Sequence, residues 1–261
     1  MPTSNLVCTA MTVTAADPLD MPDCPDAIHV KDERIAVLEK EIISAVEESN
    51  CSGGGEFYLK LPLTKLNHAQ FPVAVVDTPG VNDGFDAKYS HLANEMILAL
   101  NNPVVLYVSH TRTCGTTDEE KCLMRLADTM KAKGLTEWFV AINGWNYIDP
   151  EEDEWEKMKY QRKMRSMANK CGLPEPKIYF VAAMPAELCI KSMEGKTLDR
   201  SEKNELTLYL KQFDLYEKAR SNRRMLGRVS NTTLRMAMYH SGITSLGRAL
   251  FSYMKTKAKG Q

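Results

Sequence analysis

The strongest constraint on the fold of this 261-residue chain is an alternation of apolar runs with amphipathic segments. The runs PVAVVD (72–77), PVVLYVSH (103–110), EWFVAIN (137–143) and KIYFVAA (177–183) are apolar nearly throughout, which is typical of strands covered on both faces. Helical spacing of apolar residues separates the first three runs, and an acidic stretch from Asp149 precedes the fourth. Strand–helix alternation predicts an α/β fold with a mostly parallel sheet flanked by helices.

The remaining segments predict a single domain over residues 1–261. Residues 32–48 have the spacing of an amphipathic helix, and EFYLKLPL (56–63) alternates polar and apolar residues like an edge strand. Residues 241–254 predict a closing helix with Ser241 as its N-cap. Residues 194–235 are polar, with a helix expected around Leu206 and Leu210, and we interpret them as an insertion on the sheet.

Composition excludes several classes of protein. A net charge of −1 gives no overall attraction to nucleic acid, so no specific nucleic-acid binding is expected. The seven cysteines are odd in number and scattered, which indicates reduced thiols in a cytoplasmic protein. A basic segment at 218–235 is most simply a solvated face, although it could meet phosphates, lipid headgroups or an acidic partner.

The predicted strands end at Asp77, His110, Asn143 and Ala182. In a parallel sheet these positions meet at the edge where ligands bind. The turn after the first strand is Asp77-Thr78-Pro79-Gly80. The carboxylate of Asp77 suits magnesium held through water, and the N–H of Gly80 can approach a terminal phosphate closely. The alternative is an ordinary turn in which Asp77 caps a backbone amide.

Four residues extend this hypothesis of a nucleotide site. Asn143 could orient a loop that holds a base, and the backbone of Ala182 and Ala183 could face the same base. The hydroxyl of Thr9, just before a strand-like segment, could reach magnesium, or it could simply be solvated.

In order and spacing, CTAMTV (8–13), VVDTPGVND (75–83), VAINGWN (140–146) and FVAAMPA (180–186) resemble the GTPase domain of dynamin-like large GTPases, particularly the bacterial ones. The resemblance implies a P-loop GTPase-like fold that binds GTP or GDP with Mg²⁺. It also implies GTP hydrolysis, pairing as a homodimer or with a partner dynamin-like GTPase, and peripheral membrane association. By resemblance, Thr9 is the catalytic and metal-binding residue of the first switch, and Asp77 to Gly80 form the second, with Asp77 on the metal. Nucleotide-binding positions of the base site are Asn143, Asn146, Ala182 and Ala183.

The chain departs from the family pattern in two places. It contains no G-x-x-x-x-G-K-[ST] phosphate loop, and CSGGGEFY (51–58) has no lysine behind it. We therefore expect a domain incomplete at its N-terminus, or a remnant, with little or no hydrolysis. The guanine motif reads Asn143-Gly144-Trp145-Asn146 where the family has Asn/Thr-Lys-x-Asp. The NH₂ group of Asn146 would face a donor of guanine, so guanine preference should be weakened.

Three functions remain open on sequence alone. The first is the GTP-binding and GTP-hydrolysing domain, impaired by the missing loop. The second is a nucleotide-free pseudo-GTPase module that associates with a partner GTPase. The third is an unrelated Rossmann-like enzyme that uses His110 or Cys114.

Overall fold

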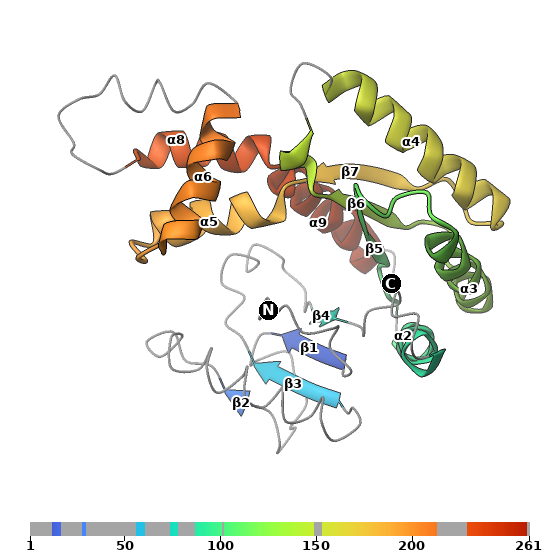
Figure 1. The fold of residues 1–261 in the computed structure, drawn as a ribbon. Helices are drawn as coiled ribbons and strands as arrows, with labels where there is room; N and C mark the ends of the chain where they lie inside the picture. Colours follow the sequence, from blue (N-terminus) through green and yellow to red (C-terminus); the bar gives the residue numbers. More distant parts are fainter. Residues whose placement is uncertain are drawn as a thin grey trace. The chain divides into compact units, whose positions relative to one another are not determined.

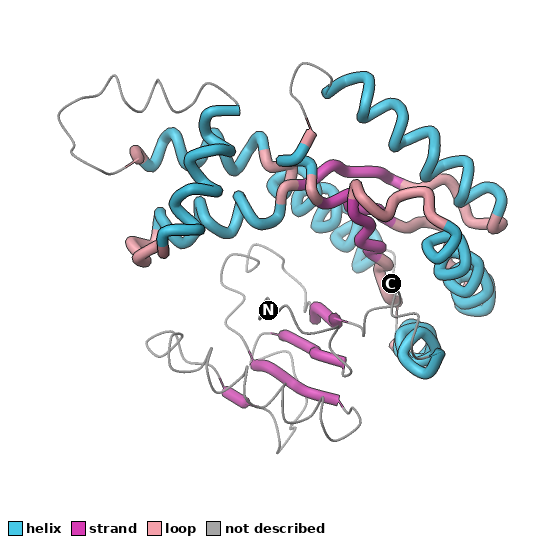
Figure 2. The backbone as a smooth tube through the Cα atoms, in the orientation of Figure 1, coloured by secondary structure: helices cyan, strands magenta, loops and turns pink. Residues whose placement is uncertain are grey.

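A computed structural model describes residues 12–16, 28–29, 56–60, 74–77, 87–100, 102–148, 153–212 and 229–259. The chain divides into two compact units, residues 1–103 with 255–261, and residues 104–254. Figure 1 gives the element labels, and Figure 2 separates helices, strands and loops by colour.

The first unit contains a four-stranded sheet of order β2-β3-β1-β4. Its strands β1 and β3 are parallel, as are β2 and β3, whereas β1 and β4 are antiparallel, with Val13 opposite Asp77. The elements of this unit are β1 (Thr12–Ala16), β2 (Ile28–His29), β3 (Glu56–Lys60), β4 (Ala74–Asp77) and α2 (Ala87–Ala99).

Two strand predictions in this unit are wrong for the described strands. β3 pairs on both sides and is not an edge strand, whereas β4 pairs only with β1 and so lies at the edge. The apolar run that ends at Asp77 therefore does not join the later strands in one parallel sheet. An apolar run predicts that the side chains of a strand are buried. It does not predict which other strand forms backbone hydrogen bonds with it. The helix predicted at 32–48 lies outside the described residues.

The second unit contains a parallel three-stranded sheet of order β5-β6-β7, as the alternation predicted. Helices α3 and α4 make the two crossovers between these strands. The elements are β5 (Leu106–His110), α3 (Thr117–Lys133), β6 (Phe139–Asn143), the 3₁₀ turn η2 (Trp145–Tyr147), α4 (Asp153–Lys170), β7 (Lys177–Val181), α5 (Ala183–Met193), α6 (Arg200–Gln212), α8 (Asn231–His240) and α9 (Ile243–Lys259).

The central strand of this sheet, β6, is covered by apolar side chains on both faces. Val140 and Ile142 of β6 are completely buried. On one face, Leu246 of α9 packs against Ala141 and Val181. Figure 1 shows α9 along one side of this sheet and α3 and α4 on the other. A strand covered on both faces needs a continuous apolar sequence, and FVAIN supplies it.

Described residues of the segment interpreted as a polar insertion, 194–235, take part in a second apolar core. Helices α5, α6 and α8 lie together in Figure 1. Their shared buried residues are Leu188, Cys189, Leu198, Leu206, Tyr209, Leu210, Leu234 and Ala237. The predicted helix around Leu206 and Leu210 is confirmed as α6. Its apolar face is buried against other helices.

The closing helix begins one residue later than its predicted cap implies. Ser241 is the C-cap of α8, where its hydroxyl donates to the carbonyl of Met238 at 2.6 Å, and its Oγ also accepts from the N–H of Ile243 at 3.4 Å. Among the helices that the structure describes, none is long and apolar enough to cross a membrane.

Candidate functional site at the ends of three parallel strands

The carboxyl ends of β5, β6 and β7 lie side by side at one edge of the three-stranded sheet. His110 is in register with Asn143, and Asn143 is in register with Val181, which precedes Ala182. Of the four residues predicted to meet at one edge, His110, Asn143 and Ala182 lie at or next to the ends of these strands, whereas Asp77 ends a strand of the other sheet. We call this edge, with the residues that directly follow each strand, the strand-end edge.

Hydrogen bonds join the segments that follow β5 and β6. The N–H of Thr111 donates to the carbonyl of Asn143 at 2.9 Å, and the Thr111 hydroxyl lies 3.5 Å from the carbonyl of Gly144. Gly144 has a φ of 87°, and an added Cβ there would lie 2.8 Å from the His110 ring and from Thr111 Oγ1. Glycine at 144 therefore allows both the turn and the close approach of the two segments.

The side chain of Asn143 joins β6 to the segment after β7. Its Oδ1 accepts a hydrogen bond from the N–H of Ala183 at 3.1 Å, one of the N–H groups at the start of α5 that lack a helical partner. The N–H of Ala182 donates to the carbonyl of Ser241 at 2.9 Å. Asn143 thus links the end of β6 to the start of α5, and the N–H groups of Ala182 and Ala183 are both paired within the chain.

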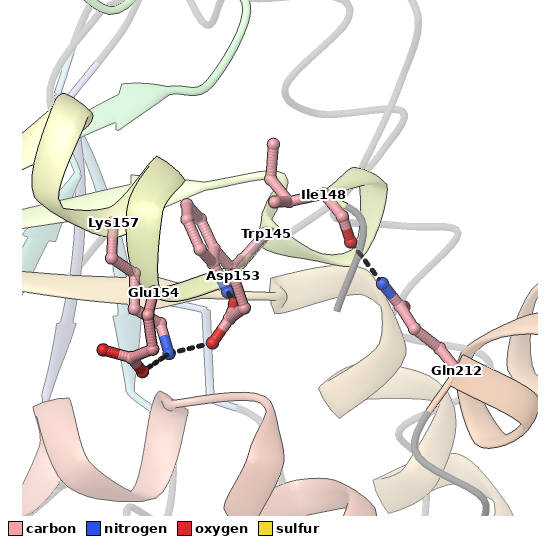
Figure 3. A network of polar contacts seen from close by, with 6 residues as sticks. All are labelled: Trp145, Ile148, Asp153, Glu154, Lys157 and Gln212. Atoms are coloured by element: carbon pink, nitrogen blue, oxygen red, sulfur yellow. Dashed lines mark hydrogen bonds and ion pairs between the residues drawn. The ribbon is translucent and has the colours of Figure 1, made fainter. Parts of the chain in front are cut away.

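The turn that follows Asn143, residues 144–148, is anchored by Trp145. Its indole is buried, lies 4.3 Å from the Phe180 ring between centroids, and donates to Asp153 Oδ1 at 2.5 Å. Asp153 in turn forms an ion pair with Lys157 (Figure 3). We call residues 144–148 the base loop. Trp145 anchors this loop to the start of α4.

Two side chains of α6 also hold the base loop. Gln212 Nε2 donates to the carbonyl of Ile148 at 2.6 Å, also drawn in Figure 3. Asn146 Nδ2 donates to Glu205 Oε1 at 3.2 Å. Sequence reasoning missed Glu205 and Gln212, because they lie about sixty residues beyond the loop and carry no local motif. The sequence indicates only that Glu205 and Gln212 belong to an amphipathic helix with a buried apolar face.

An arginine and an aromatic ring lie on the outer side of the same edge. The guanidinium of Arg112 stands 5.2 Å from the centroid of the Tyr147 ring, which is 56% exposed. The His110 ring is tilted against Tyr147 at 6.5 Å, and its Nδ1 accepts from the N–H of Arg112 at 3.1 Å. Burial, followed by the charge of Arg112, lowers the pKa of His110. The edge thus presents flat surfaces against which a ring can stack.

Beside β5, a buried cluster disfavours Cys114 as a nucleophile. Glu119 is 1% exposed, and it accepts from the Ser109 hydroxyl and from the N–H of Gly115, the latter at 2.7 Å. Burial and the Glu119 carboxyl raise the pKa of the Cys114 thiol to about 11. A buried thiol that stays protonated at neutral pH is a poor nucleophile. The cluster instead fixes residues 111–115 against α3.

The structure does not place the other predicted site residues relative to this edge. Asp77 ends β4 in the four-stranded sheet, and only its backbone is described. Thr9, Thr78, Pro79, Gly80 and the basic residues 218–228 lie outside the described residues. The described residues contain no cluster of three metal-ligating side chains, but the predicted Mg²⁺ site would use Thr9 and Asp77, so that prediction stays untested.

Comparison with known proteins does not assign a family to this chain, because neither the models of known families nor the curated proteins gave a match.

Proposed function

We propose that this chain is a guanine-nucleotide-binding domain of the dynamin-like type, with its base site at the strand-end edge. One observation carries the proposal. The Oδ1 of Asn143 accepts from the N–H of Ala183, so one side chain ties together the two segments that the resemblance assigns to the base. The alternative role of this contact is to cap the N-terminus of α5. Nucleotide binding depends on the contact if it shapes the base site, and does not depend on it if it only caps the helix.

The missing phosphate loop sets the expected strength of binding. Backbone amides and a lysine of that loop are the main source of affinity for the phosphates. With no such motif in the sequence, we expect weak binding of GDP and GTP and little hydrolysis. Mg²⁺ accompanying GTP, a homodimer or a partner dynamin-like GTPase, and association with a membrane surface belong to the same proposal.

A titration of the full chain with a fluorescent GDP analogue tests the proposal. We expect saturable binding that unlabelled GDP displaces and ADP does not. Asn143→Ala should weaken it about tenfold, the effect of losing one hydrogen bond of about 1–1.5 kcal/mol. Asn169→Ala, which removes an exposed asparagine of α4, is the matched control and should bind like the unchanged chain.

The alternative is the nucleotide-free module that associates with a partner GTPase. The absence of a phosphate-loop motif favours it. Two apolar side chains on β5, an edge strand of the three-stranded sheet, also favour it, because Val108 is 62% and Leu106 37% exposed. No saturable binding at millimolar nucleotide, by a chain with an intact circular dichroism spectrum, would select the module and contradict our proposal.

A further inference from the structure

The contact between Asn146 and Glu205 changes what the base loop can recognise. Asn146 belongs to η2 and Glu205 to α6, and both side chains are half-buried. The 3.2 Å hydrogen bond uses the NH₂ group of Asn146 and one carboxylate oxygen of Glu205. The assignment of the amide follows from chemistry, because a carboxylate can only accept and an amide oxygen cannot donate.

What remains on both side chains is a pair of acceptors. The structure gives Asn146 Oδ1 and Glu205 Oε2 no hydrogen-bond partner among the described residues. A neutral asparagine alone offers an acceptor and a donor side by side. With its NH₂ group donating to Glu205, Asn146 keeps its oxygen as an acceptor, and Glu205 keeps its second carboxylate oxygen as another.

We propose that Asn146 and Glu205 together form the base-reading edge of the nucleotide site and select guanine, an inference that rests on the function proposed above. Guanine carries two neighbouring donors, its N1–H and its 2-amino group. The amide oxygen of Asn146 and the second carboxylate oxygen of Glu205 can accept from these donors, and a carboxylate acceptor strengthens the hydrogen bonds. Glu205 thereby supplies the negative charge that the base motif of this chain lacks at position 146.

The same pair disfavours other bases. Adenine has an acceptor at N1, where it would face another acceptor. Xanthine has a 2-oxo group in place of the 2-amino group of guanine, so it too would face the pair with an acceptor. Adenine and xanthine should bind more weakly than guanine, because burying a polar group without a hydrogen-bond partner costs more binding free energy than one matched hydrogen bond contributes. The comparison of guanine with xanthine therefore isolates the acceptor pair.

The test measures competition by GDP and by xanthosine diphosphate against a fluorescent GDP analogue on the full chain. Glu205→Gln keeps the size of the side chain and replaces its charge with an amide that can donate. Glu205→Ala frees the amide of Asn146 to turn its NH₂ outward. Glu154→Gln is the matched control, because that carboxylate is 89% exposed. Circular dichroism melting confirms that each variant is folded.

We expect the unchanged chain and Glu154→Gln to prefer GDP, and both Glu205 variants to lose about tenfold or more of that preference. A purely structural role for Glu205 would lower both affinities together, and an unchanged GDP-to-xanthosine diphosphate ratio in the Glu205 variants would overturn the inference while leaving the proposed function intact. A wild-type chain that binds neither nucleotide would overturn both.

Discussion

Two stretches of this chain have the same local pattern of strand, helix and strand, yet they have different outcomes. β5, α3 and β6 form a parallel pair joined by a crossover helix. β4, α2 and β5 have the same order, but β4 pairs with β1 and belongs to a different sheet from β5. The pattern alone therefore does not decide which strands pair.

The side chains that the structure describes differ in burial between the two helices. In α3 the buried residues are Glu119, Cys122, Leu123, Leu126, Thr129 and Met130. In α2, only Ala93 is buried among the side chains that the structure describes, residues 93–99. A crossover helix aligns two parallel strands only when its apolar face packs on the sheet they form, because that burial offsets the entropy of ordering the connection.

The largest effect on stability is expected at Gly242, in the turn between α8 and α9 that packs against β7. Its φ is 73°, and an added Cβ would overlap the carbonyl oxygen of Phe180. Gly242→Ala should lower the free energy of unfolding by at least about 3 kcal/mol, because strained backbone and steric overlap add. Urea unfolding followed by circular dichroism measures it.

The control for Gly242 is a glycine of the same helix pair. Gly247 lies within α9, and an added Cβ there meets no atom within 4 Å. Gly247→Ala should be neutral or stabilise by up to about 1 kcal/mol, because alanine favours helix. Equal effects of the two substitutions would show that the turn does not support the three-stranded sheet.

A matched pair of leucines tests the packing comparison itself. Leu123 of α3 is completely buried, whereas Leu98 of α2 is 42% exposed. Leu123→Ala should destabilise the protein by about 2–5 kcal/mol, since it removes buried methyl groups and leaves a cavity. Leu98→Ala should cost no more than about 0.5 kcal/mol. A Leu98 effect as large as that of Leu123 would mean that α2 packs as a crossover helix after all.

A smaller effect is expected at Glu119, which joins the end of β5 to α3. Glu119→Ala leaves the Ser109 hydroxyl and the Gly115 N–H without their acceptor, which should cost about 1–3 kcal/mol. Exposed Asp118→Ala is the control for the same helix turn. Equal loss in both variants would contradict the role given to the buried carboxyl.

The Glu119 carboxyl also has a pH signature. Burial raises its pKa above the ordinary value of 4.5, against the opposing effect of its hydrogen bonds. The folded state then holds the proton more tightly than the unfolded state, so this contribution is complete below pH 4.5 and is lost as the pH rises through the folded pKa. Unfolding measured across that range should show wild-type stability falling relative to Glu119→Gln as pH increases. A constant difference would contradict the raised pKa.

The sequence was sufficient to predict those helices and strands that have a distinctive local pattern of apolar residues. The apolar runs at 103–110, 137–143 and 177–183 contain β5, β6 and β7, and the helix expected around Leu206 and Leu210 is α6. The neighbours of β3 and β4 were not predictable, because an apolar pattern fixes which face is buried and leaves the pairing partner open.

Part of the candidate site could likewise be predicted from the sequence. Asn143, Ala182 and Ala183 lie at or just after strand ends, which periodicity can locate, whereas Asn146 was named only through the resemblance. Glu205 stands on a helix that was interpreted as part of an insertion, and only tertiary packing of α5, α6 and α8 brings it to Asn146. Charged residues on helices are common, so no local feature distinguishes this one.

The central claim is that the strand-end edge of β5–β6–β7 holds a guanine base, and backbone amide NMR of the full chain during GDP titration tests it most directly. The account predicts saturable shifts of the amide resonances of Gly144 to Tyr147, Ala182 and Ala183, with similar GDP concentrations at half-saturation. Unshifted resonances at these positions, with or without changes elsewhere in the chain, would contradict it.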